Sequence, residues 1–91
     1  MIYEWDEEKR LSNLRKHGID FIDVVDFEWD TALVVPDTRK EYGEPRYIAL
    51  GYLDDAVHCL IFTERGENKR IISLRKANGR ERKRYEKTIQ G

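Results

Sequence analysis

Three β-rich runs follow one another in the second half of the chain, and this arrangement constrains the fold most. The runs extend from Arg46 to Leu53, from Val57 to Glu64 and from Lys69 to Arg75. Only Asp54-Asp55 and the segment from Arg65 to Asn68 separate them. Because connections this short join antiparallel strands, the pattern predicts a meander of three neighbouring strands.

The first half of the chain predicts two helices. Asp6 is a suitable N-cap for a helix that continues to about Lys16 and ends at Gly18. Leu11 and Leu14 lie one turn apart and are expected to form a narrow stripe facing inward. Asp20 is a suitable cap for a second helix. Its apolar residues at helical spacing are Phe21, Val24, Val25 and either Phe27 or Trp29.

Two short strands and one further helix complete the expected elements. Residues 2–5 and 32–35 favour strands, Pro36 ends the second of them, and residues 37–45 form a polar loop. Asn78 is a suitable cap for a last helix that continues to about Ile89. The expected order is β-α-α-β-β-β-β-α, an α+β fold with an antiparallel sheet, two N-terminal helices and one C-terminal helix. At 91 residues, we expect a single domain spanning residues 1–91.

Alternation along the last strand predicts which side chains share a face. Lys69, Ile71, Ser73 and Arg75 fall on one side, and Arg70, Ile72, Leu74 and Lys76 on the other. The side of Ile72 and Leu74 is the better candidate for the helix-covered core. Ser73 and Arg75 are then directed to an open face, and Arg70 is expected to face the helices, where it can pair with an acid.

The charges are sorted along the chain. Residues 1–64 hold 7 Lys/Arg and 15 Asp/Glu, a net charge of −8, whereas residues 65–91 hold 10 and 3, a net charge of +7. A basic segment of this kind is typical of a surface that binds phosphates. The alternative is a solvated basic helix that pairs with acidic surface elsewhere.

Several functional classes lack the residues that they need. The glycines form no phosphate-binding loop, and His17, His58 and Cys59 do not have a recognised metal-ligand spacing, so we expect no metal or cofactor. Cys59 lies in an apolar run and is expected to be a buried thiol, which indicates a reducing compartment. The N-terminus does not resemble a secretory signal, and no apolar stretch is long enough to span a membrane. These features favour a cytoplasmic protein.

A cluster of arginines beside hydroxyl groups suits RNA cleavage. The 2′-OH of RNA is a built-in nucleophile, so the protein must hold the strand in line, stabilise phosphoryl charge and move protons. Arginine serves the first two tasks, because its planar group binds phosphate bidentately and stays charged. Proton transfer needs a different side chain, such as Lys, His, Glu or Tyr.

The motifs resemble those of a known family across almost the whole chain. The blocks in order are Trp5-Asp6, Lys9, Asn13, Lys16-His17-Gly18-Ile19, Phe21, Gly43-Glu44-Pro45-Arg46, Thr63-Glu64-Arg65, Arg70-Ile71-Ile72-Ser73, Arg75-Lys76-Ala77, Glu81-Arg82 and Tyr85-Glu86. They resemble the BrnT toxin family. Leu74 and Gly79 depart from the family pattern, and neither change removes a candidate catalytic group.

The resemblance implies a fold, an activity and partners. It implies a compact cytoplasmic ribonuclease toxin with a fold related to the RelE toxins. The implied partner is a BrnA antitoxin whose ribbon-helix-helix part binds operator DNA, so the toxin would meet DNA only through a hetero-oligomeric complex with the antitoxin.

The candidate site residues fall into three groups, each with a plainer structural alternative. The candidate catalytic residues are Arg75, Arg65, Arg46 and Ser73; the candidate RNA-binding residues are Arg70, Lys76, Arg82 and Tyr85; and the candidate acid or base residues are His17 and Glu81. For the arginines the alternative is a surface ion pair, and for Ser73 it is simple packing. Tyr85 can instead pack the last helix onto the sheet, Glu81 can form helix pairs, and His17 can serve the carbonyls at a helix C-terminus.

These residues predict a sequence-tolerant, metal-independent endoribonuclease toxin that cleaves by 2′-OH attack. Two other hypotheses remain. One is a non-catalytic module that binds nucleic acid through the same basic segment. The other is an interaction domain whose basic face serves only to dock an acidic antitoxin segment.

Overall fold

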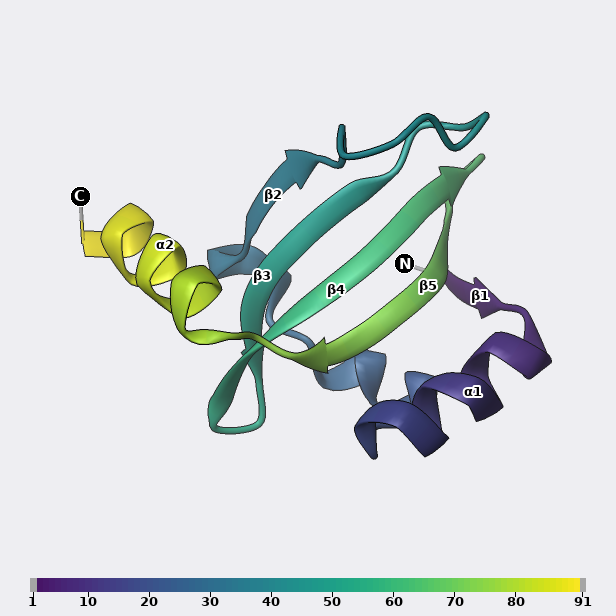
Figure 1. Cartoon of the computed structure of the whole chain (residues 1–91), viewed down its shortest axis with the longest axis horizontal. Helices are drawn as coiled ribbons and strands as arrows, with labels where there is room; N and C mark the ends of the chain where they lie inside the picture. Colours follow the sequence, from purple (N-terminus) through teal and green to yellow (C-terminus); the bar gives the residue numbers. More distant parts are fainter. Residues whose placement is uncertain (1, 91) are drawn as a thin grey trace.

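A five-stranded sheet with the strand order β1-β5-β4-β3-β2 organises the computed structural model, which describes residues 2–90 (Figure 1). The strands are β1 (Ile2–Trp5), β2 (Leu33–Pro36), β3 (Tyr47–Leu53), β4 (Ala56–Arg65) and β5 (Asn68–Lys76). The helices are α1 (Glu7–His17), the 3₁₀ segments η1 (Phe21–Asp26) and η2 (Trp29–Thr31), and α2 (Gly79–Gln90). The predicted α+β class and the β3-β4-β5 meander are confirmed. Strand β1 departs from the antiparallel prediction, because it pairs with β5 in parallel.

Helix α1 begins and ends at the predicted residues. The Asp6 carboxylate accepts hydrogen bonds from the backbone N–H groups of Glu8 and Lys9. Gly18 then adopts a left-handed conformation with φ of 70°, which costs a residue without a side chain little.

The second predicted helix is instead a 3₁₀ segment, η1. Asp20 caps it as expected, and its buried residues are Phe21 and Val24, followed by buried Phe27 just beyond its end. Because these residues are three apart, a helix with three residues per turn aligns them toward the core. Val25 is 68% exposed, so the α-helical spacing that included it was wrong.

The inward stripe predicted for α1 is also wrong. Leu11 and Leu14 are 40% and 38% exposed, and the residue of α1 that is buried is Asn13. The Asn13 amide donates to the Leu74 carbonyl at 2.7 Å and accepts from the Leu74 N–H at 3.1 Å. Since β1 pairs with β5 only as far as Ile71, this side chain supplies the edge hydrogen bonds that a neighbouring strand would make.

Both faces of the sheet carry apolar residues. The larger core lies beneath η1 and η2 and comprises Phe21, Val24, Phe27, Ala49, Leu53, Leu60, Phe62, Ile71 and Leu74. The opposite face carries a smaller cluster, with Leu50, Val57, Cys59, Ile61, Ala77 and Tyr85. Helix α2 covers one end of this second face and leaves the rest uncovered (Figure 1). We call this second face of the β3-β4-β5 sheet the open face.

A β-bulge in β5 corrects the predicted strand faces. Ile61 pairs with Ser73 and Phe62 pairs with Ile71, so Ile72 is an extra residue without an opposite partner. Leu74 lies in the larger core as predicted. Ile71 lies there too, and Ile72 packs on the smaller cluster, so both were assigned to the wrong face.

Among residues 2–90, no helix has the length and apolar character needed to cross a membrane.

Candidate functional site

The register of β4 and β5 places three predicted site residues on the open face. Arg75 is opposite Cys59, Ser73 is opposite Ile61, and Arg70 is opposite Thr63. The three β4 residues alternate along a regular strand, so they share one face. Arg70 therefore joins Ser73 and Arg75, contrary to the prediction from strict alternation, because the bulge at Ile72 shifts the alternation by one residue.

Arg75 forms a bidentate ion pair with Glu81. Its two terminal nitrogens donate to the two carboxylate oxygens at 2.8 and 3.0 Å. Glu81 belongs to a capping box, in which its carboxylate accepts from the Asn78 N–H while the Asn78 side chain accepts from the Glu81 N–H. The geometry of the helix start thus fixes the carboxylate that orients Arg75.

This pairing sets the ionisation of both groups. The hydrogen bonds from Arg75 lower the pKa of Glu81, although its partial burial opposes them. The Glu81 carboxylate raises the pKa of Arg75. At neutral pH the Glu81 carboxylate is therefore ionised and the Arg75 guanidinium is charged.

Cys59, which lies on β4 opposite Arg75, carries a buried thiol. It is 1% exposed, and burial raises its pKa to about 11. The nearby charges of Arg75 and Arg39 oppose that rise. A buried neutral thiol is not a nucleophile at neutral pH, which agrees with the expectation from sequence.

Arg39 is a residue of this region that sequence reasoning missed. The charge of Arg39 acts to lower the pKa of both Cys59 and Arg75. It is held by Asp37, whose carboxylate accepts from Arg39 Nε at 2.8 Å and from a terminal nitrogen at 2.9 Å. The Arg39 hydrogen bonds lower the pKa of Asp37 to about 2. The local signal was an acid two residues before an arginine, directly after the strand-ending Pro36.

Arg46 and Arg65 meet at another carboxylate, Glu44. Arg46 Nε lies 3.4 Å and an Arg65 terminal nitrogen 3.8 Å from its oxygens. The Arg46 guanidinium also stacks on the Tyr42 ring, 4.1 Å from its centroid. The Thr63 hydroxyl donates to the carbonyl of Pro45, the residue before Arg46. Thr63 is four residues along β4 from Cys59, so Arg46 lies roughly 13 Å from the Arg75 row.

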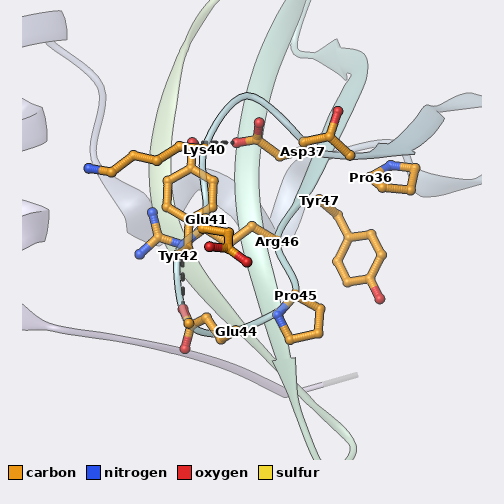
Figure 2. A pocket seen from close by; sticks show the side chains of 11 residues that line it. Pro36, Asp37, Lys40, Glu41, Tyr42, Glu44, Pro45, Arg46 and Tyr47 are labelled. Carbon is orange, nitrogen blue, oxygen red and sulfur yellow. Dashed lines mark hydrogen bonds and ion pairs between the residues drawn. The ribbon is translucent and has the colours of Figure 1, made fainter.

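A cavity lies at this second cluster. It has a volume of about 660 Å³ and is formed by the loop between β2 and β3 (Figure 2). Tyr42 and Arg46 line it, and the Tyr42 hydroxyl donates to Asp37. The cavity is thus linked to the carboxylate that holds Arg39.

Arg70 pairs with Glu4 of β1 at 3.0 Å. The structural alternative, an ion pair, is therefore present at four of the candidate arginines, three in strands and one just before β3. The residues concerned are Arg46, Arg65, Arg70 and Arg75.

The remaining basic candidates differ in exposure. Lys76 and Arg82 are exposed, and Arg82 donates to the Ala77 carbonyl. Tyr85 is 1% exposed and packs edge-to-face on Tyr52, so its prediction as an RNA-stacking residue is wrong. It belongs to the smaller apolar cluster and packs α2 onto the sheet, as the structural alternative predicted.

Ser73 and His17 are brought together from distant parts of the sequence. Both line a second cavity of about 250 Å³ between α1 and β5. His17 itself is exposed at the end of α1. The structure therefore groups the candidates at three places: Arg75 with Glu81, Arg46 with Arg65, and Ser73 with His17.

Comparison with known proteins agrees with this architecture. Residues 5–81 match the family described as ribonuclease toxin, BrnT, of type II toxin-antitoxin system. A 1.1 Å crystal structure of the Brucella abortus ribonuclease toxin BrnT is similar, with a TM-score of 0.68 and 31% sequence identity. The alignment covers 86% of this chain and 99% of that chain. No curated protein sequence matches the chain. The chain belongs to the BrnT family of ribonuclease toxins of type II toxin-antitoxin systems.

Proposed function

We propose that this protein is a metal-independent, sequence-tolerant endoribonuclease whose site is the open face around Arg75. The observation that carries the proposal is the Arg75–Glu81 pair beside Ser73. It presents a positive charge and an ionised carboxylate where α2 meets the sheet, and the two side chains remain 28% and 22% exposed. Transphosphorylation of RNA requires charge stabilisation and a proton acceptor at one place.

The reaction that we propose is attack of a 2′-OH on its own phosphodiester. Glu81 accepts the 2′-OH proton, the O2′–P bond forms and the P–O5′ bond breaks. Arg75 stabilises the charge on the phosphoryl oxygens, and Ser73 donates a hydrogen bond to one of them. The leaving 5′-oxygen takes a proton from His17, which lines a cavity with Ser73. The products carry a 2′,3′-cyclic phosphate, or a 3′-phosphate after hydrolysis, and a 5′-hydroxyl.

The ion pairs of the sheet arginines do not prevent phosphate binding. Partly exposed pairs contribute only about 0–1 kcal/mol, so a phosphate can compete with the carboxylate or share the guanidinium. Arg46 and Arg65 lie 3.4 and 3.8 Å from Glu44, which are loose contacts. The Arg75 Nε–H forms no hydrogen bond with residues 2–90 and remains available to a phosphate oxygen. At the loop cavity, Tyr42 offers an aromatic surface for a neighbouring base.

A member of a toxin-antitoxin family has an antitoxin partner. We propose a BrnA-like ribbon-helix-helix antitoxin that covers the open face, acts in the cytoplasm and carries the complex to operator DNA. Crosslinks between the two chains should then map to β3, β5 and α2. Crosslinks confined to the acidic surface of α1 and η1 would count against this arrangement.

The nuclease proposal is tested by incubating the purified protein with RNA in EDTA. We expect fragments with cyclic-phosphate ends, and no cleavage at a position whose 2′-OH is replaced by hydrogen. Cleavage that persists at the 2′-deoxy position would exclude the mechanism. Salt-dependent binding with no fragments would identify a non-catalytic binding module instead.

A further inference from the structure

The cavity between α1 and β5 has an unusual lining. Its residues include Lys9, Ser12, Asn13, Lys16 and His17 from α1 and Ser73 from β5. The lining holds two lysines and no carboxylate. A concave site of this composition is suited to an anion.

The lysines are on the side of α1 where a helix normally carries apolar residues. Lys9, Ser12 and Lys16 follow the spacing i, i+3 and i+7, which places them on one stripe beside β5. Leu11 and Leu14 are directed to solvent instead. Asn13 on the same side is explained by its hydrogen bonds to Leu74. Within residues 2–90, the lysine side chains form no comparable hydrogen bond to the fold.

Neither lysine is neutralised by a neighbouring acid within residues 2–90. Arg10, on the same helix, forms ion pairs with Glu7 and Asp20. Lys9 and Lys16 have no carboxylate within 4.0 Å in that part of the chain, so the cavity keeps its positive charge.

The helix dipole explains only part of this arrangement. Lys16 and His17 lie in the last turn of α1, where positive charge is stabilising. Lys9 lies in the first turn, where positive charge is unfavourable. Its presence there is better explained by a ligand than by stability.

We infer that this cavity binds a phosphate group of the RNA strand, next to the group that is cleaved. The ammonium groups of Lys9 and Lys16 and the hydroxyl of Ser12 supply charge and hydrogen bonds, while the Ser73 hydroxyl serves the phosphate that is cleaved. Ser73 also joins the cavity to the open face, because it lies two residues from Arg75, about 7 Å along β5. The identity of the ligand as RNA depends on the proposed ribonuclease function, but the anion site itself does not.

The test is the salt dependence of binding to a 2′-O-methyl oligoribonucleotide, which cannot be cleaved by this mechanism. The double variant Lys9→Gln/Lys16→Gln removes the charge from the cavity. Arg15→Gln is the matched control, since Arg15 is exposed on α1 and is not among the cavity residues. Circular dichroism verifies that each variant is folded.

Loss of one phosphate contact should reduce the slope of log affinity against log salt by about 0.7 in the double variant. The control should keep the wild-type slope. Titration of the wild type with inorganic phosphate should shift the amide signals of Ser12 and Ser73, and the double variant should lose these shifts.

Equal slopes for wild type and double variant would overturn the inference. So would a double variant that keeps its RNA affinity but no longer binds the antitoxin, because the cavity would then be a protein-docking site. Wild-type protein that binds through the cavity yet does not cleave RNA would refute the proposed ribonuclease activity and leave the phosphate site standing.

Discussion

At the scale of single residues, the account centres on a guanidinium and the carboxylate that holds it. The position of Arg75 on the open face could be predicted from alternation, and Glu81 could be predicted from the Asn78-to-Glu81 spacing of a capping box. Arg39 could not be predicted. Asp37 two residues earlier is a local signal for the ion pair, but the place of that pair in the fold depends on the path of an irregular loop.

The proposed proton acceptor gives the first prediction. Glu81→Gln keeps a residue that is suitable for the capping box, so the helix should remain capped. Single-turnover cleavage should fall by about 10²-fold or more, because the amide does not accept a proton. Affinity for the 2′-O-methyl oligoribonucleotide should change little.

Glu86→Gln, on the exposed surface of α2, is the control for this experiment. A folded Glu81→Gln protein that cleaves RNA at the rate of the control would remove Glu81 from the mechanism.

The Asp37–Arg39 pair predicts a specific pH dependence of stability. The pKa of Asp37 is about 2 in the folded protein, against 3.8 for an aspartate that is free in water, as in the unfolded chain. Because the folded pKa is the lower one, the pair stabilises the fold above about pH 4 and loses this effect as the pH falls to 2. The difference in unfolding free energy between wild type and Asp37→Asn should shrink across this range. A difference that is constant from pH 5 to pH 2 would contradict the assignment.

At the scale of secondary-structure elements, the regular strands and the ends of α1 could be predicted, and the irregular features could not. The bulge at Ile72 leaves no mark in the local sequence, yet it moves Arg70 to the open face. The 3₁₀ form of η1 follows from burial of Phe21, Val24 and Phe27 at a period of three. Whether the segment forms a 3₁₀-helix or an α-helix depends on how its apolar residues pack on the sheet, so tertiary packing decides its form.

Asn13 should be one of the most important polar residues for stability. Asn13→Ala leaves the buried N–H and carbonyl of Leu74 without their partners, which should cost about 2–4 kcal/mol. Urea denaturation measures this loss. Asn68→Ala is the control, since its side chain makes one long hydrogen bond of 3.4 Å and should cost less than about 1 kcal/mol. Equal losses for the two variants would contradict the edge-pairing role.

Two glycines should respond to alanine in opposite directions. A Cβ at Gly51 would lie 2.9 Å from Phe27 Cζ and 3.1 Å from Ala32 Cβ, so Gly51→Ala should destabilise the protein by about 1–3 kcal/mol. A Cβ at Gly79 meets nothing closer than 3.8 Å at the start of α2. Gly79→Ala should stabilise the helix by about 0.5–1 kcal/mol. Thermal unfolding of both variants tests the pair, and a stabilised Gly51→Ala protein would show that η1 is not packed closely against β3.

At the scale of the whole molecule, the charges that are separated in sequence meet in space. Acids of residues 1–64 neutralise three basic side chains of residues 65–91, through the pairs Arg65–Glu44, Lys69–Glu64 and Arg70–Glu4. The charge asymmetry predicted a phosphate-binding surface, but it did not reveal that neutralisation, because pairing depends on the fold. Exposed positive charge remains on α2, at Arg80, Arg82, Lys83 and Arg84, beside the Arg75–Glu81 pair.

The most direct test of the central claim is the rate at which Arg75→Ala cleaves RNA in EDTA. Arg84→Ala, an exposed arginine of α2, is the matched control, and circular dichroism verifies that both variants are folded. The account predicts that Arg75→Ala loses on the order of 10²–10³ in cleavage rate while Arg84→Ala keeps the wild-type rate. A folded Arg75→Ala protein that cleaves RNA as fast as the wild type would contradict it.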